Sequence, residues 1–124
     1  VSSAWREHEL NPVLVDNMSA RNGGLLLRNG QLPVRVRQDQ GFDQYGAGFS
    51  LARISRLSPS DFAEKETVRF EVDSVPSLSG CHHLSIGGGW LATDFLCPPG
   101  LDGSSLDQVL MQISERALGG MSRI

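Results

Sequence analysis

The sequence predicts an α+β domain, in which an antiparallel sheet built from hairpins carries a C-terminal amphipathic helix packed on one face. Three observations predict this class: short alternating apolar segments between turn residues, an Asn29-Gly30 hairpin signal, and one long segment of helical periodicity at the end of the chain. Strands joined by tight turns pair antiparallel, and a single late helix can cover one face. The 124 residues are enough for one core, so we expect a single domain over residues 1–124.

The N-terminal segment and the first hairpin are predicted from their capping and turn residues. Residues 2–10 are expected to make one or two helical turns that end at Asn11-Pro12. Asn29-Gly30 suits a type I′ turn, which needs positive φ at both central residues. Its arms are residues 25–28 and 32–37, and Pro33 makes the second arm an edge strand.

The middle of the chain is expected to alternate between loop, strand and a short helix. The polar, glycine-rich residues 38–48 predict a loop, and residues 49–54 predict a strand. Ser58, followed by Pro59 and Asp61, has the residue types of a helix N-terminus, so we expect a short helix there. Residues 67–73 alternate apolar and charged side chains, as a half-buried strand does.

The last third predicts a hairpin and a helix. Residues 83–86 and 90–96 are expected to form two strands around three consecutive glycines. Residues 103–120 predict a helix, with Ser104 and Asp107 as its capping box and Gly119-Gly120 as its end. Its expected apolar face consists of Leu106, Val109, Leu110, Ile113 and Ala117.

The composition excludes several classes of partner. Hydrophobic residues make up 40% of the chain and charged residues 20%, close to globular averages. The formal net charge is -3, whereas nucleic acids attract concentrated positive charge, so we expect no nucleic-acid partner. No apolar run reaches the roughly 18 residues that a membrane span needs. Lys65 is the only lysine beside ten arginines, a bias that we take to indicate a bacterial genome rich in G and C.

The two cysteines lie at the base of the predicted glycine hairpin. In the expected pairing Cys81 faces Phe95, two residues short of Cys97, and one bulge would close that gap. A disulfide closing a loop of this size contributes about 3 kcal/mol and persists in oxidising compartments. We predict a disulfide between Cys81 and Cys97 and, with it, an exported protein, periplasmic or extracellular. The alternative is a cytosolic protein with two free thiols.

The adjacent histidines raise an enzymatic alternative. His82 and His83 stand beside Cys81, and all three residue types bind zinc. Neighbouring residues on a strand point to opposite faces, however, and the spacings of the common zinc motifs are absent. The sequence also lacks a serine elbow and a phosphate-binding loop. We expect neither a cofactor nor a metal, and the alternative is a small metal-dependent enzyme that uses His82 or His83.

Two surfaces are candidates for partner contact. The polar loop carries Phe42, Asp43 and Tyr45, and aromatic side chains among polar ones are typical of recognition loops. Arg35 and Arg37 share one face of a predicted strand, and Arg53, Arg56 or Arg69 could join that face in the sheet. Such a face would bind an acidic partner or a carboxylate ligand. The alternative is a solvated face paired with the carboxylates of Glu71, Asp73 or Glu64.

The prediction for function follows partly by elimination. We expect a non-enzymatic binding or assembly subunit of a bacterial cell-envelope, pilus or secretion-type complex, with a protein partner. The exposed edge strand at Pro33 would allow oligomers to form by strand addition. A cytosolic partner-binding protein of the immunity type is the third hypothesis.

Overall fold

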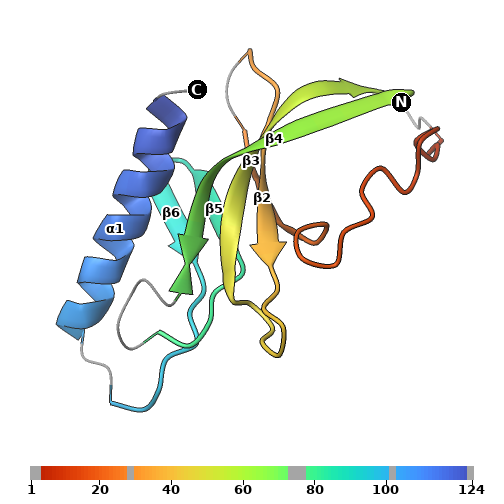
Figure 1. The fold of residues 1–124 in the computed structure, drawn as a ribbon. Helices are drawn as coiled ribbons and strands as arrows, with labels where there is room; N and C mark the ends of the chain where they lie inside the picture. The colour runs from red at the N-terminus through yellow and green to blue at the C-terminus, as the bar shows by residue number, and fades with distance from the viewer. Residues whose placement is uncertain (1–3, 28–29, 73–77, 101–102, 123–124) are drawn as a thin grey trace.

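The structure is a computed structural model of the whole chain. It describes residues 4–27, 30–72, 78–100 and 103–122, with only the backbone for residues 105, 106 and 116–122. Antiparallel strands joined as hairpins make up most of the fold, and one helix follows them at the C-terminal end (Figure 1). This confirms the predicted antiparallel hairpin sheet and the late helix, within a mostly β architecture.

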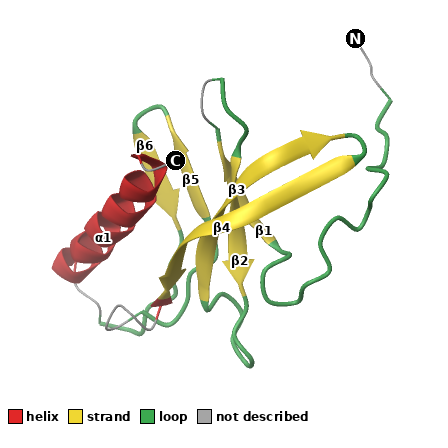
Figure 2. Cartoon of the chain, turned by 45° about the horizontal axis from the view of Figure 1, so that its top comes forward, coloured by secondary structure: helices red, strands yellow, loops and turns green. Residues whose placement is uncertain are grey.

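The strands form two sheets. The larger has four strands in the order β1-β2-β3-β4, and the smaller is the hairpin β5-β6. Figure 2 shows β3 and β4 as one long hairpin that extends past the other strands. The elements are β1 (Asn22–Leu26), β2 (Val34–Asp39), β3 (Gly48–Ser58), β4 (Asp61–Glu71), β5 (Leu84–Gly87), β6 (Trp90–Thr93) and α1 (Gly103–Ser122).

The first hairpin is present, but β2 is not an edge strand. β1 pairs with β2 from Leu26 opposite Val34, while Asn29 of the predicted turn lies outside the described residues. β2 pairs on its other side with β3, so it has neighbours on both sides. Pro33 is tolerated because it precedes the strand, and its carbonyl accepts a hydrogen bond from the Ile54 amide at 3.4 Å.

The predicted short helix at Ser58 is wrong, because these residues form the tip of the β3-β4 hairpin. Ser58 pairs with Asp61, and Pro59 and Ser60 make the turn between them. Serine, proline and aspartate favour tight turns as well as helix starts, and here the strands on both sides decide the outcome. Arg56 and Asp61 form an ion pair of 2.7 Å near this tip.

The predicted N-terminal helical turns are also wrong. Residues 4–8 have no regular structure, and residues 9–10 form a turn. The segment lies against the hairpin tip, where the Glu9 amide donates to the Pro59 carbonyl at 3.1 Å and the His8 ring contacts the Ser58 carbonyl at 2.8 Å. These long-range contacts outweigh the weak local preference of a few residues for helix.

The apolar face of the larger sheet holds the core. Strand residues of this face, together with Leu84 of β5 and Val109 and Ile113 of α1, belong to one buried cluster. α1 lies beside β4 (Figure 1), whereas β5 contacts β1, the opposite edge strand of the larger sheet. The strand members of the cluster are Leu26, Val34, Val36, Phe49, Leu51 and Phe70.

Two glycines allow the β5 segment to approach β1 closely. A Cβ atom on Gly23 would lie 2.3 Å from the carbonyl oxygen of His82, and one on Gly24 would lie 2.5 Å from that of Leu84. Gly24 also has a φ of 136°, which side chains disfavour. The β5-β6 hairpin itself closes with Gly87 opposite Trp90 through Gly88-Gly89, both at positive φ, as in a type I′ turn.

The replacement Gly23→Ala is therefore expected to destabilise the fold by roughly 2 kcal/mol or more, because the methyl group would push the β5 segment away from β1. The matched control is Gly87→Ala, a strand glycine with no atom within 4 Å of the added Cβ. Urea unfolding should show a loss for Gly23→Ala and a change within about 0.5 kcal/mol for Gly87→Ala. Equal losses for both variants would refute the close packing of the two segments.

Candidate functional site

The loop at residues 40–47 joins β2 to β3 and is held firmly at its base. The Gly41 amide donates to the Gln44 carbonyl at 3.0 Å, which closes the loop on itself. The Cys81 amide donates to the Gly46 carbonyl at 2.8 Å, and Gly46 has a φ of 73°. The side-chain amide of Gln44 contacts the Ser79 carbonyl. The loop is thus anchored to the segment that precedes β5.

Three residues predicted to contact a partner, Phe42, Asp43 and Tyr45, lie on this loop and differ in how far neighbouring side chains hold them in place. Phe42 is fully exposed and Asp43 is exposed beside it. Tyr45 is 59% exposed and packs edge-on against His82, with ring centroids 5.2 Å apart. The guanidinium of Arg21 lies 5.5 Å from the Tyr45 ring centre, a cation–π contact.

His82 is held in place by Asp94, which follows β6. One Asp94 carboxylate oxygen contacts Nδ1 of His82. The other oxygen accepts hydrogen bonds from the backbone amides of His83 at 2.7 Å and His82 at 3.3 Å. Asp94 therefore ties the start of β5 to the end of β6 and orients the His82 ring toward Tyr45. No pattern in the sequence indicates Asp94, because only the folded hairpin brings it next to His82.

Four exposed apolar side chains lie on this loop or beside it, and we call them the loop patch: Met18, Phe42, Tyr45 and Leu96. Tyr45 and Leu96 line a hollow of about 240 Å³ together with His82 and Asp94. Met18 lies beside the loop, since its carbonyl accepts a hydrogen bond from the Gln40 amide at 3.2 Å. The four side chains are 47%, 100%, 59% and 63% exposed. Polar groups thus border a set of solvent-exposed apolar side chains.

The two cysteines are free in the structure, so the predicted disulfide is not present there. Gly80 pairs with Leu96, which places Cys81 and Cys97 on opposite sides of that pair. Such diagonal positions are about 7–8 Å apart, beyond the Cα separation of most disulfides. Burial raises the pKa of the Cys81 thiol to about 12, so this thiol stays protonated at neutral pH.

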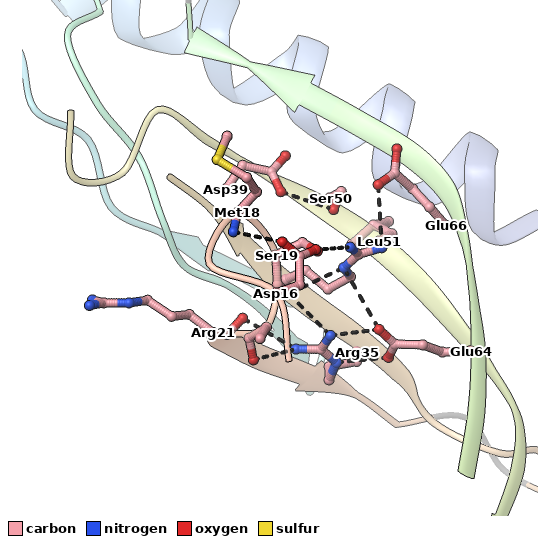
Figure 3. A network of polar contacts seen from close by, with 12 residues as sticks. Asp16, Met18, Ser19, Arg21, Arg35, Asp39, Ser50, Leu51, Glu64 and Glu66 are labelled. Carbon is pink, nitrogen blue, oxygen red and sulfur yellow. Dashed lines mark hydrogen bonds and ion pairs between the residues drawn. The ribbon is translucent and has the colours of Figure 1, made fainter. Parts of the chain in front are cut away.

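The arginine face is an internal network rather than an open surface (Figure 3). Arg35 is 8% exposed and binds Glu64 through two hydrogen bonds of 2.6 and 2.8 Å. It also donates to the carbonyls of Ser19, Ala20 and Arg21, at 3.2 to 3.3 Å. Because these contacts use its guanidinium, Arg35 supports the fold and is not available to an acidic partner.

Arg37 is likewise engaged with carboxylates of its own chain and largely buried. It lies 3.4 Å from Glu66, 3.7 Å from Glu64 and 3.9 Å from Asp16, and its side chain is 15% exposed. The predicted pairing of this face with Glu64 is present, but the face is largely buried rather than solvated, and Asp73 lies outside the described residues. These contacts do not support partner binding by Arg35 and Arg37. The segment that covers them, residues 16–21, had no recognisable pattern in the sequence.

Around Arg69, at another end of this network, neighbouring ionisable side chains also shift each other's pKa. Hydrogen bonding from Arg69 lowers the pKa of Glu66, and the Glu66 carboxylate in turn raises the pKa of Arg69. Asp39 shows the opposite behaviour, since burial raises the pKa of its carboxyl although Arg69 lies 3.2 Å away. Because Arg69 forms ion pairs with both carboxylates, we infer that these three side chains stabilise the fold.

Among the described residues, no three histidine, cysteine, aspartate or glutamate side chains come together in a way that could hold a metal ion. The same part of the chain contains no helix with the length and apolar content of a membrane crossing. Comparisons of the chain with known protein families, with curated proteins and with solved structures found no match.

The cysteine geometry predicts an ordered pattern of thiol reactivity. Iodoacetamide at pH about 8 should label Cys97 quickly and Cys81 slowly in the folded protein, because Cys81 is buried and its pKa is raised, whereas Cys97 is half-buried. Both should react in denaturant without any reductant, as intact mass would show, and Cys97→Ser should remove the fast reaction. Labelling that requires prior reduction would establish the disulfide instead.

Proposed function

We propose that this protein is a non-enzymatic binding or assembly subunit that contacts a protein partner through the loop patch. The observation that carries the proposal is Phe42, a fully exposed aromatic side chain on an anchored loop. A fully exposed phenylalanine buries no apolar surface within its own chain. Aromatic side chains that become buried against a partner are frequent anchors at the centre of protein interfaces.

The surroundings of Phe42 support the same proposal. Tyr45 is braced by His82 and Arg21, so a partner would meet a side chain whose orientation is already restricted. Preorganisation of this kind lowers the conformational entropy lost on binding. The hollow beside Tyr45 is about 240 Å³, room for one apolar side chain of a partner rather than for a large substrate.

For the C-terminal helix we propose an amphipathic packing mode. Val109 and Ile113 of α1 are buried, whereas Gln108 and Met111 are exposed. One apolar stripe facing the core would leave the rest of the helix in solvent. For oligomers formed by strand addition, the proposed edges are β1 and β4, the outer strands of the larger sheet, since β2 lies inside it.

The cellular compartment that we propose depends on whether Cys81 and Cys97 form a disulfide. Membership of a cell-envelope, pilus or secretion-type complex is a proposal that requires the Cys81–Cys97 disulfide. The free thiols support the alternative, a partner-binding protein of the immunity type in a reducing compartment. Both versions use the same loop patch.

An enzyme is the second candidate, and the His82–Asp94 pair favours it. A carboxylate that orients an imidazole is a recurring feature of general bases. The neighbouring Cys81 thiol does not complete such a site, because its pKa of about 12 keeps it protonated. The pair also has a structural role at the base of the β5-β6 hairpin, and we therefore favour binding.

The proposal predicts that position 42 touches the partner. A photo-reactive phenylalanine analogue in place of Phe42 should give discrete crosslinked products in extracts of cells that naturally produce the protein, and Tyr45→Ala should weaken them. The control position is Leu57, which is 51% exposed at the far end of β3. Identical products from both positions, or none from position 42, would contradict the proposal.

A further inference from the structure

A groove of about 660 Å³ lies where β3 and β4 continue beyond the start of β2. The loop patch is at the opposite end of the β2-β3 pairing, because its loop joins Asp39 to Gly48. The groove is therefore a separate site, independent of the proposed partner contact. Its lining includes Gln31, Leu32, Val34, Arg53, Lys65 and Thr67.

Two cations lie side by side in the lining of this groove. Arg53 of β3 pairs directly with Lys65 of β4, so their side chains leave the same face of the sheet at neighbouring positions. Like charges in such directly opposed pairs destabilise a sheet. The pairing arises between two register shifts, one at Leu51/Ala52 and one at Ile54/Arg56, so bulged backbone on either side sets it.

Neither cation is neutralised within the described part of the chain. Each arginine of the neighbouring sheet positions has a carboxylate: Arg35 has Glu64, Arg56 has Asp61, and Arg69 has Glu66. In the same described regions, the side chains of Arg53 and Lys65 form no ion pair and no hydrogen bond, and both residues are exposed. The hydroxyl of Thr67 is engaged with the Leu51 carbonyl at 3.1 Å, which leaves the two cations as the polar centre of the groove.

The floor and one wall of the groove are apolar. Val34 is 1% exposed and forms part of the floor, and Leu32 is 42% exposed beside it. An ion pair formed against apolar surface is less screened than one in open water. The volume lies within the range of about 300–1,000 Å³ that is usual for small-molecule sites. The groove thus offers positive charge next to apolar surface in a space of ligand size.

We propose that this groove binds a carboxylate carried on an apolar group, with Arg53 and Lys65 sharing the negative charge. The planar guanidinium of Arg53 can bind both carboxylate oxygens, and the Lys65 ammonium adds a second positive charge. The apolar part of the ligand lies against Leu32 and Val34. The source is either a free carboxylic acid or an acidic side chain of a polypeptide, and the chemistry of recognition is the same.

The test is an NMR titration of the isotope-labelled full-length chain with octanoate, with neutral octanamide, and with an acetylated, amidated Leu-Glu-Leu peptide. Octanoate should shift the signals of Arg53, Lys65 and Val34, and octanamide should bind at least about fivefold more weakly. Lys65→Gln and Arg53→Gln should each weaken octanoate binding by about fivefold to tenfold. The matched control is Arg56→Gln, which removes an arginine already paired with Asp61 and should leave the titration unchanged.

The outcomes separate the two sources. Binding of octanoate that depends on both cations supports the proposal with a free acid as ligand. Binding of the peptide alone, with the same dependence, supports it with an acidic side chain as ligand. No binding of either probe, or binding that persists in both Gln variants, would overturn it. Crosslinking at position 42 is unaffected by any of these results, because the two sites lie at opposite ends of the β2-β3 pairing.

Discussion

The ion pair between Arg35 and Glu64 is the contact on which the rest of the structure depends. It joins β2 to β4 over the intervening strand β3, with the Arg35 side chain 10% and the Glu64 side chain 5% exposed. Removing two charges from water costs several kcal/mol, which only good geometry and additional hydrogen bonds offset. Here the geometry is bidentate, and three backbone carbonyls accept the remaining donors of Arg35.

This pair makes one face of the larger sheet charged, whereas the other face is apolar. Another part of the chain covers each of the two faces. Residues 19–21 reach the charged face through their carbonyls, so the N-terminal segment is held where it would otherwise have little apolar surface to bury. The apolar face is covered instead by Leu84, Val109 and Ile113. With both faces occupied, the two surfaces that we propose for binding lie at the two ends of the β2-β3 pairing: the loop patch at one and the Arg53–Lys65 groove at the other.

Local sequence patterns predicted the strands and turns whose conformation is set by residues close together in the chain. Of the alternating residues 67–73, residues 67–71 lie in a strand, as do residues 49–54, and two of the three consecutive glycines form a hairpin turn. The same reasoning failed at Ser58-Pro59, where one set of residue types suits both a helix start and a turn. It also failed for residues 4–10, whose conformation is set by contacts with the distant hairpin tip.

The sites were predicted only in part, because contacts between distant residues define them. Period-two alternation placed Arg35 on the charged face, yet nothing in it indicated that residues 16–21 would cover that side chain. Asp94 gained its role through the turn that returns it to His82. Arg53 opposes Lys65 only because bulges shift the register of β3 and β4, and bulges leave little trace in a single sequence.

The most direct test of this account is a double-mutant cycle on Arg35 and Glu64, followed by the free energy of unfolding in urea. Glu64→Leu alone is expected to cost about 3–5 kcal/mol, since it leaves a buried guanidinium without its carboxylate. Arg35→Met alone should cost a similar amount, since it leaves a buried carboxylate without its guanidinium. The double variant Arg35→Met with Glu64→Leu should recover most of either loss, because no charge remains buried. Losses below about 1 kcal/mol for Glu64→Leu, or losses that simply add in the double variant, would show that the pair is a minor surface contact and contradict the account.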